Sequence, residues 1–154
     1  MIIKKGRHSS GLHFGIVPMD RGVANNVTFT DSCRYGFQDY HGQVHKIFGI
    51  GFLPYHRWQS IRFGWTYHGG DLILVHSYIY DNGRRTIEPM VWVPIGSSTS
   101  MSIIPGPDGG YTMRAAHVVK HIDIRPKWGY KLWPYFGGQN VAPHDIKINL
   151  ENIK

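Results

Sequence analysis

The sequence has very little cysteine and no long hydrophobic segment, and each shortage excludes a class of protein. Cys33 is the only cysteine in 154 residues, so no disulfide can form within the chain. No stretch approaches the roughly 18 consecutive apolar residues of a transmembrane helix. The first ten residues lack the apolar region of a secretory signal. We therefore expect no membrane span and no recognisable export signal, while a processed chain would look the same.

Acidic residues are also scarce, which argues against several kinds of hydrolase. There are only ten, and Glu88 and Glu151 are the only glutamates. A glycosidase needs two carboxylic acids facing each other across the scissile bond, and no clustered pair is visible. The sequence also lacks the Gly-x-Ser-x-Gly elbow, the phosphate-binding loop and the dinucleotide-binding glycine pattern. No cofactor is predicted.

Positive charge is in excess and is distributed along the chain. Seventeen lysines and arginines against ten acids give a net charge of +7. Because the basic residues form no continuous block, a dedicated nucleic-acid-binding tail is not expected. A basic surface of this kind attracts acidic partners and limits self-association.

Residues 71–80 form the plainest strand. Alternation puts β-branched residues on one of its faces and leucine, histidine and tyrosine side chains on the other. Turn signals at residues 68–71 and at Asn82-Gly83 bracket it, and Asn-Gly is typical of a two-residue hairpin turn. Residues 60–95 are therefore predicted to form a three-stranded meander.

Further short strands are predicted along most of the chain, without a helical pattern between them. They lie at residues 12–18, 26–31, 42–50, 98–104, 110–115, 117–124, 129–136 and 144–150. This spacing predicts an all-β fold, an antiparallel two-sheet β-sandwich of the jelly-roll or concanavalin-like kind. We expect one domain, residues 1–154, in which residues 1–11 form a flexible or partner-binding N-terminal arm.

Ten histidines raise the question of a metal site. His41 and His45 are four residues apart, and His56 follows, but the spacing matches no zinc or iron pattern and Cys33 has no cysteine partner. No metal is predicted, and whether these three histidines bind one stays open.

Aromatic side chains exceed what one small core needs, and flat rings with a polar tip stack on sugars or on proteins. Three are expected in the core, namely Phe63, Trp65 and Trp92. Four are the candidate ligand-binding residues, namely Tyr78, Tyr80, Trp128 and Trp133.

The Gln-Val-His segment at residues 43–45 resembles a strand motif of jelly-roll alginate lyases, and a tyrosine-rich segment lies near the C-terminus, as in those enzymes. Such a lyase needs donors for the carboxylate of a uronic acid and a base for the C5 proton. The resemblance implies that Gln43 and Arg62 would be the donors, and His45 or Tyr135 the base. The arginine-rich first motif of those enzymes is absent.

Four further segments form a second pattern: Arg-Phe-Gly-Trp at 62–65, Tyr-Ile-Tyr-Asp-Asn-Gly-Arg at 78–84, Gly-Tyr-Lys-Leu-Trp-Pro-Tyr-Phe-Gly-Gly at 129–138 and Ala-Pro-His-Asp-Ile at 142–146. They resemble an uncharacterised family of concanavalin-like β-sandwich proteins from Bacteroidetes and their phages. The resemblance implies the sandwich fold and supplies no catalytic residues. Family members are often secreted or lipid-anchored, so the missing export signal favours a phage-borne or processed copy.

Three functional hypotheses follow. The leading one is a non-enzymatic recognition module that binds a glycan or neighbouring protein subunits. The second is a phage virion structural protein, such as a capsid decoration, head fibre or tail component, which would assemble as a homo-oligomer or on capsid or tail subunits. The third is a polysaccharide lyase acting on an acidic glycan. The location stays unknown, and a virion or an extracellular, processed form is compatible with the sequence.

Overall fold

The computed structural model describes residues 1–36, 40 and 42–153, and within them the chain forms two antiparallel sheets of six strands. The β3 sheet contains, in order, β1 (Ile2–Ile3), β12 (Ile146–Asn152), β3 (Val23–Phe29), β8 (Ser98–Pro105), β9 (Tyr111–Ala115) and β10 (Val118–Ile122). The β5 sheet contains β2 (Ile16–Val17), β11 (Gly129–Leu132), β4 (His45–Gly51), β5 (Ser60–Tyr67), β6 (Leu72–Asp81) and β7 (Arg84–Pro94). One short 3-10 helix, η1 (Asp31–Cys33), follows β3 in the described part of the chain. The predicted all-β sandwich is confirmed.

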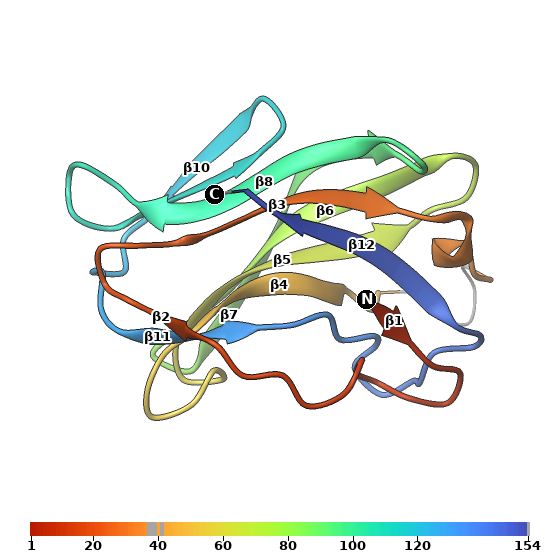
Figure 1. Ribbon diagram of the computed structural model, residues 1–154, viewed down its shortest axis with the longest axis horizontal. Helices are drawn as coiled ribbons and strands as arrows, with labels where there is room; N and C mark the ends of the chain where they lie inside the picture. The colour runs from red at the N-terminus through yellow and green to blue at the C-terminus, as the bar shows by residue number, and fades with distance from the viewer. Residues whose placement is uncertain (37–39, 41, 154) are drawn as a thin grey trace.

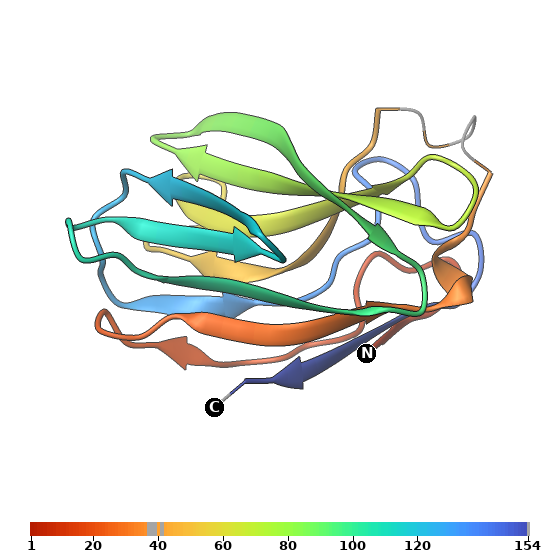
Figure 2. The same ribbon diagram turned by 90° about the horizontal axis from the view of Figure 1, so that it is seen from above.

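The two sheets lie face to face. Figure 1 shows β12 crossing in front of β5, and Figure 2, seen from above, places β6 and β7 on the opposite side of the sandwich from β12. Both termini lie at the β12 side of the molecule (Figure 2). One face of each sheet is thus buried against the other, and the outer face is free for a ligand.

The core is built from the alternating residues that face inward. In β3, every second residue from Val23 to Phe29 is buried, and in β5, Ile61, Phe63 and Trp65 fill the space between the sheets. Burial of such rings and branched side chains contributes about 1.5–3 kcal/mol each. The expectation that Phe63 and Trp65 are buried is confirmed.

The predicted meander is present as β5, β6 and β7. The turn between β6 and β7 is formed by Asn82 and Gly83, both with positive φ, at 49° and 77°. Two consecutive positive φ values are those of the hairpin turn that the sequence predicts. In β7, the register shifts next to Pro89, which agrees with the inability of proline to donate to a ladder.

Trp92 corrects one expectation, because its side chain is 49% exposed and does not enter the core. In the register of β6 and β7, Trp92 lies opposite Leu74, whereas Val93 lies opposite Ile73. Ile73 and Val93 point into the core, so their neighbours Leu74 and Trp92 must point to the outer face.

The first residues lie along the sandwich. Ile2 and Ile3 pair with β12, and the N-terminal ammonium donates to the Ile148 carbonyl. His8 lies on the Tyr135 ring, and Ser9 forms a β-bridge with Tyr135. The segment expected as an N-terminal arm therefore packs against β12 and the segment around Tyr135. In the described residues, no helix is long and apolar enough to cross a membrane.

Replacing Gly83 with Val should lower the free energy of unfolding by about 1–3 kcal/mol, because a β-branched residue is forced to positive φ. A chemical denaturation series measures this. Gly83→Asn is the matched control. Its free energy of unfolding should fall by less, since asparagine tolerates positive φ better than valine does. Equal stability of the valine variant and the wild type would contradict the turn assignment.

Candidate functional site

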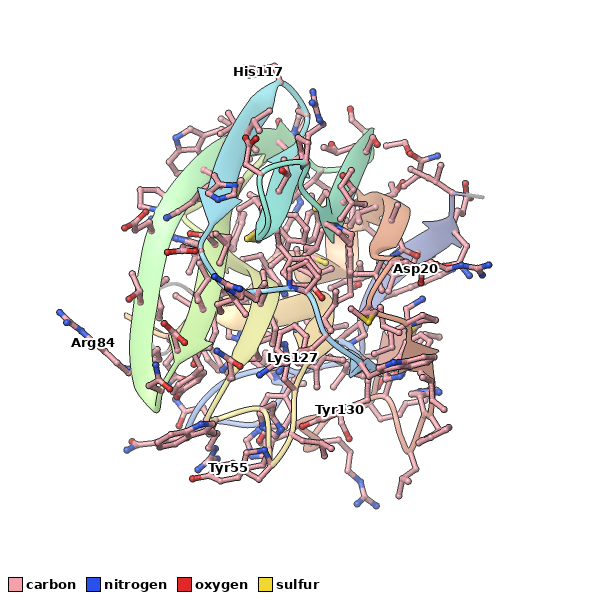
Figure 3. The ribbon with its side chains drawn as sticks, turned by 90° about the vertical axis from the view of Figure 1, so that its left-hand side faces the viewer. Asp20, Tyr55, Arg84, His117, Lys127 and Tyr130 are labelled. Atoms are coloured by element: carbon pink, nitrogen blue, oxygen red, sulfur yellow. The ribbon has the colours of Figure 1, made fainter. Side chains whose placement is uncertain are left out.

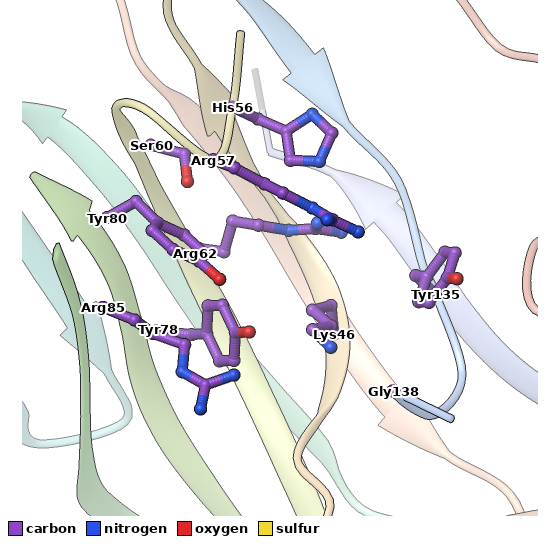
Figure 4. Close-up of a pocket in the computed structure, with 10 residues that line it drawn as sticks. All are labelled: Lys46, His56, Arg57, Ser60, Arg62, Tyr78, Tyr80, Arg85, Tyr135 and Gly138. Atoms are coloured by element: carbon purple, nitrogen blue, oxygen red, sulfur yellow. The ribbon is translucent and has the colours of Figure 1, made fainter. Parts of the chain in front are cut away.

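A cavity of about 430 Å³ opens on the outer face of the β5 sheet. β4, β5, β6 and β7 form its floor and one wall, and two loops close it (Figure 4). It is lined by Lys46, His56, Arg57, Ser60, Arg62, Tyr78, Tyr80, Arg85, Tyr135 and Gly138. The volume is that of a typical small-ligand site. Below, this set is called the basic pocket.

Strand alternation places these side chains on the outer face. Arg62 pairs with Tyr78, and Ser60 pairs with Tyr80, and each lies one residue away from a core residue. On β4, Gly49 is opposite Arg62, where a Cβ atom would stand 2.7 Å from Arg62 Cγ. Only glycine leaves room for the Arg62 side chain at that point.

Loops bring the remaining residues to the strands. The segment between β4 and β5 supplies His56 and Arg57, and the segment after β11 supplies Tyr135. In Figure 4, Tyr135 stands on the opposite side of Lys46 from Tyr78. Figure 3 shows the end of the sandwich that carries the first loop, with Tyr55 and Tyr130 on the same lower side and Arg84 apart, at the tip of the β6–β7 hairpin.

Among the described residues, the lining contains three arginines, one lysine and no carboxylate. Within the described residues, none of these four cations takes part in an ion pair. Cations that gather without counter-charges repel one another, so an anionic ligand would stabilise the arrangement.

Arg62 is the most deeply placed cation, with only 8% of the residue exposed. Its Nη2 donates to the Trp133 carbonyl at 2.8 Å, while its buried Nε has no hydrogen-bond partner among the described residues. Burial lowers the pKa of Arg62 to about 10. The side chain is still charged at neutral pH. An arginine whose position is fixed by burial and by a backbone hydrogen bond is suited to bind a carboxylate.

Lys46 occupies the centre of the pocket. Its Nζ donates to the Gly137 carbonyl at 3.1 Å and lies 4.9 Å from the centre of the Tyr78 ring and 5.5 Å from that of Tyr135. Burial, followed by the nearby charge of Arg62, lowers the pKa of Lys46 to about 8. A lysine in this range exchanges a proton readily near neutral pH.

Tyrosines complete the walls. Burial raises the pKa of Tyr78, although its hydrogen bond to Arg85 lowers it. The same hydrogen bond raises the pKa of Arg85. On the other wall, the ring of Tyr135 is stacked on His8, with 5.1 Å between centres and 6° between planes. The rings of Tyr78 and Tyr135 lie on two sides of the Lys46 ammonium.

His45 lies on the opposite face of β4 from Lys46, in the core. Its Nδ1 accepts the Gly137 N–H at 2.7 Å, so Nε2 carries the proton and donates to the Tyr35 hydroxyl at 2.9 Å. The ring is stacked on Phe136 at 3.8 Å, and burial lowers its pKa to about 3. His45 is therefore a neutral residue that fixes the position of the Gly137 loop. Lys46, the next residue in β4, is the one whose side chain enters the pocket.

The structure separates the residues that sequence reasoning grouped together. Arg62 and Tyr135 line the basic pocket, whereas Gln43 accepts the Gly138 N–H and lines adjoining cavities. Of the four aromatic candidates, Tyr78 and Tyr80 line the pocket and two do not. Trp128 is 62% exposed, and Trp133 is half-buried between His13 and Lys131.

The histidines considered for a metal do not converge in the described residues. His41 lies outside them, His45 is in the core and His56 lines the basic pocket. No group of three or more metal-ligating side chains occurs in the described part of the chain.

Buried polar atoms without a partner mark the same face of the sheet. In the described residues five such side-chain atoms occur, and three belong to the outer face of β5 and β6: Ser60 Oγ, Arg62 Nε and His76 Nδ1. Leaving a buried polar group unpaired costs about 1–3 kcal/mol. Three of these atoms lie on the face that carries the basic pocket, and polar atoms left without a protein partner are available to bind a ligand.

Sequence reasoning missed Lys46, Arg57 and Arg85 as site residues. Lys46 has a detectable signal, since it is one residue from His45 and must face the other side of the strand. Arg57 and Arg85 have no such signal in the sequence. They reach β5 only because the fold brings the loop between β4 and β5 and the end of the β6–β7 hairpin close to that strand.

Comparison with known proteins shows similarity of fold. No family model and no curated protein sequence matches the chain. Alginate lyase Aly36B is similar, with a TM-score of 0.61 and 15% identity over 99% of this chain and 77% of that one. An alginate lyase from Pseudomonas aeruginosa has a TM-score of 0.52 and 8% identity over 87% of this chain and 65% of that one. The chain thus spans just under two thirds of the Pseudomonas enzyme, and these similarities establish the β-sandwich fold alone.

Lys46→Met should raise the melting midpoint at pH 6 by about 2–4 °C, as expected for about 1 kcal/mol in a domain of this size. The pKa of Lys46 is lowered in the folded state, so carrying its charge below pH 8 destabilises that state. Calorimetry measures the midpoint.

Lys147→Met, on the outer side of β12, is the control and should change the midpoint little. His45→Ala should lower it, because the Gly137 N–H loses its acceptor and the Tyr35 hydroxyl loses one of its two partners. A lower midpoint for Lys46→Met than for Lys147→Met would contradict this account of Lys46.

Proposed function

We propose that the chain is a polysaccharide lyase that binds an acidic glycan on the outer face of the β5 sheet and cleaves it next to a uronic acid. The observation that carries the proposal is the basic pocket itself, in which four cations lie among tyrosines with neither an ion pair nor a carboxylate in the lining among the described residues. Arginine forks bind carboxylates in two-pronged geometry, and tyrosine rings stack on sugar faces.

The reaction is a β-elimination. A base removes the proton on C5, next to the carboxylate, and the electron pair of that C–H bond becomes the C4=C5 double bond. The C4–O4 bond breaks, and O4 takes a proton. The products are a new hydroxyl end and an unsaturated uronic end, and no water is consumed.

The reaction requires a group that neutralises the carboxylate and a base that removes the C5 proton, and the pocket has a residue for each role. The carboxylate must lose its negative charge so that the C5 proton becomes acidic, and Arg62, supported by Arg85, neutralises it. The reaction also needs a base that is partly unprotonated near neutral pH. Lys46, with a pKa of about 8, is that base and takes the C5 proton. Lys46 then donates this proton to O4, so that its amine is again unprotonated at the end of the turnover.

Tyr78 and Tyr135 hold the Lys46 ammonium between them and supply surfaces for the sugar ring. His45 acts through Gly137, whose carbonyl accepts a hydrogen bond from Lys46. His45 is therefore a positioning residue in this proposal. The similarity of fold to two alginate lyases supports a lyase over the other hypotheses. The expectation of a phage virion protein stays a prediction.

With acidic polysaccharides, the wild type should produce unsaturated ends, detectable by ultraviolet absorbance. Lys46→Met should reduce kcat by about 10²–10⁴, the usual cost of a lost general base. Lys147→Met removes the same charge from the other sheet and should retain activity. Because the unprotonated amine is required, kcat/KM should rise with pH up to about 8 and then become level.

Absence of unsaturated ends with the wild type, on every uronic polymer tested, would exclude the lyase and leave binding alone. A Lys46→Met enzyme with full activity would exclude Lys46 as the base.

Binding should depend on the arginines that line the pocket. Arg85→Met should weaken the affinity for an acidic oligosaccharide about tenfold or more, because a charged hydrogen bond contributes about 1.5–3 kcal/mol. The neighbouring Arg84 points away into solvent (Figure 3), so Arg84→Met is the matched control. Titration calorimetry at two salt concentrations measures both, and binding should weaken with salt. Equal losses in the two variants would indicate nonspecific attraction by net charge.

A further inference from the structure

A second cavity, of about 290 Å³, continues the basic pocket along the same face of the β5 sheet. A third cavity joins them, since it shares Lys46 and Tyr78 with the first and Gln43 and Val44 with the second. Ser60 in the first cavity and Thr66 in the second are six residues apart along β5, about 20 Å at the rise of a strand, and the Val44 side chain lies beside Gly64 between them. The groove is therefore longer than one sugar ring.

The second cavity, called the neutral pocket below, has a different chemistry. Within the described residues its lining contains no lysine, arginine or carboxylate, and the sequence between Arg34 and Lys46 holds no further basic residue except histidine. Tyr35, Val44 and Leu74 give it largely apolar walls. All four cations of the groove are thus at one end.

The floor of the neutral pocket carries two hydrogen-bonding groups without charge, Thr66 and His76. Thr66 Oγ1 lies 2.8 Å from His76 Nε2 and 2.9 Å from His68 Nε2. Burial lowers the pKa of His76 to about 4, so its ring is neutral at physiological pH. His76 is more than nine-tenths buried, and its Nδ1 has no partner among the described residues. A sugar hydroxyl is the kind of group that such an atom binds.

An exposed tryptophan borders this end of the groove. Trp92 lies opposite Leu74 on the outer face, half exposed, with its ring edge-to-face with His68 at 5.3 Å. An aromatic ring at such an edge offers a surface for the apolar face of a sugar ring.

We infer that the glycan bound here is a mixed one, in which the uronic acid held by the basic pocket is followed by a neutral sugar held by the neutral pocket. The inference deepens the proposed function and rests on it. A chain made only of uronic acids would place a carboxylate among Val44, Leu74 and Pro89, where no lysine or arginine of the described residues replaces its lost hydration. A neutral sugar brings hydroxyls to Thr66 and His76 and a ring face to Trp92 without that cost.

Titration calorimetry at pH 6, where Lys46 is protonated and cleavage is slow, tests the inference with oligosaccharides of equal length. The mixed probes are gellan oligosaccharides, with one glucuronate among glucose and rhamnose, and hyaluronan oligosaccharides, in which glucuronate alternates with N-acetylglucosamine. The uniform probes are oligomers of mannuronate, guluronate and glucuronate. At least one mixed probe should bind about tenfold more tightly than every uniform one.

Two variants test the neutral pocket directly. Leu74→Lys places a cation there and should increase the affinity for the uniform probes about tenfold, whereas Ile104→Lys, on the β3 sheet, adds the same net charge and should not. Trp92→Ala should weaken the mixed probes about tenfold and leave the uniform ones nearly unchanged.

The outcomes distinguish this inference from the proposed function. If the uniform probes bind as tightly as the mixed ones, or if Leu74→Lys has no more effect than Ile104→Lys, the inference is overturned and the acidic-glycan site stands. If no acidic probe binds at all, both are overturned.

Discussion

The register between β5 and β6 is the constraint on which the site depends. Ile61 faces Ile79 in the core, and one residue later Arg62 faces Tyr78 on the outer surface. A slip by one residue would place Arg62 between the sheets and Ile61 in the groove, at a cost far above any gain from the site. The apolar core therefore fixes which polar side chains form the groove floor. The turn at Asn82-Gly83 extends the same constraint to β7 and Arg85.

This constraint also determines how much of the site is visible in the sequence. Period-two alternation identifies β5 and β6, the meander and the partition of their side chains into two faces. Tyr78 and Tyr80 are candidates because aromatic residues are in excess, and Arg62 is a candidate through the resemblance to alginate lyases. The pattern around residues 43–46 is ambiguous, because Val44 and His45 are both plausible core residues. The structure resolves it through the Gly137 N–H, which binds His45 and draws that ring inward. Lys46 then faces the groove.

Other features depend on contacts that no local pattern records. Arg57 and Tyr135 reach the pocket only because the loop after β4 leads into β5 and the segment after β11 runs beside Lys46 of β4. Trp92 follows a change of register near Pro89, which reverses the face that simple alternation from Ile87 would assign. Large aromatic residues are usually buried, so the composition of β7 favours the wrong side for Trp92.

The groove combines two features that a purely structural sheet surface would not have. Its cations have no counter-charges within the described residues, and polar atoms at its floor lack partners, and both reduce the stability of the fold. Sites that break local rules in this way are commonly functional ones. Among the described residues, moreover, the lysine and arginine side chains of the groove lie at the end with Arg62, while Thr66, His76 and Trp92 lie at the other end. A groove with unlike ends holds a chain of alternating chemistry in one register. It would thereby select both the bond that lies beside Lys46 and the direction in which the chain runs.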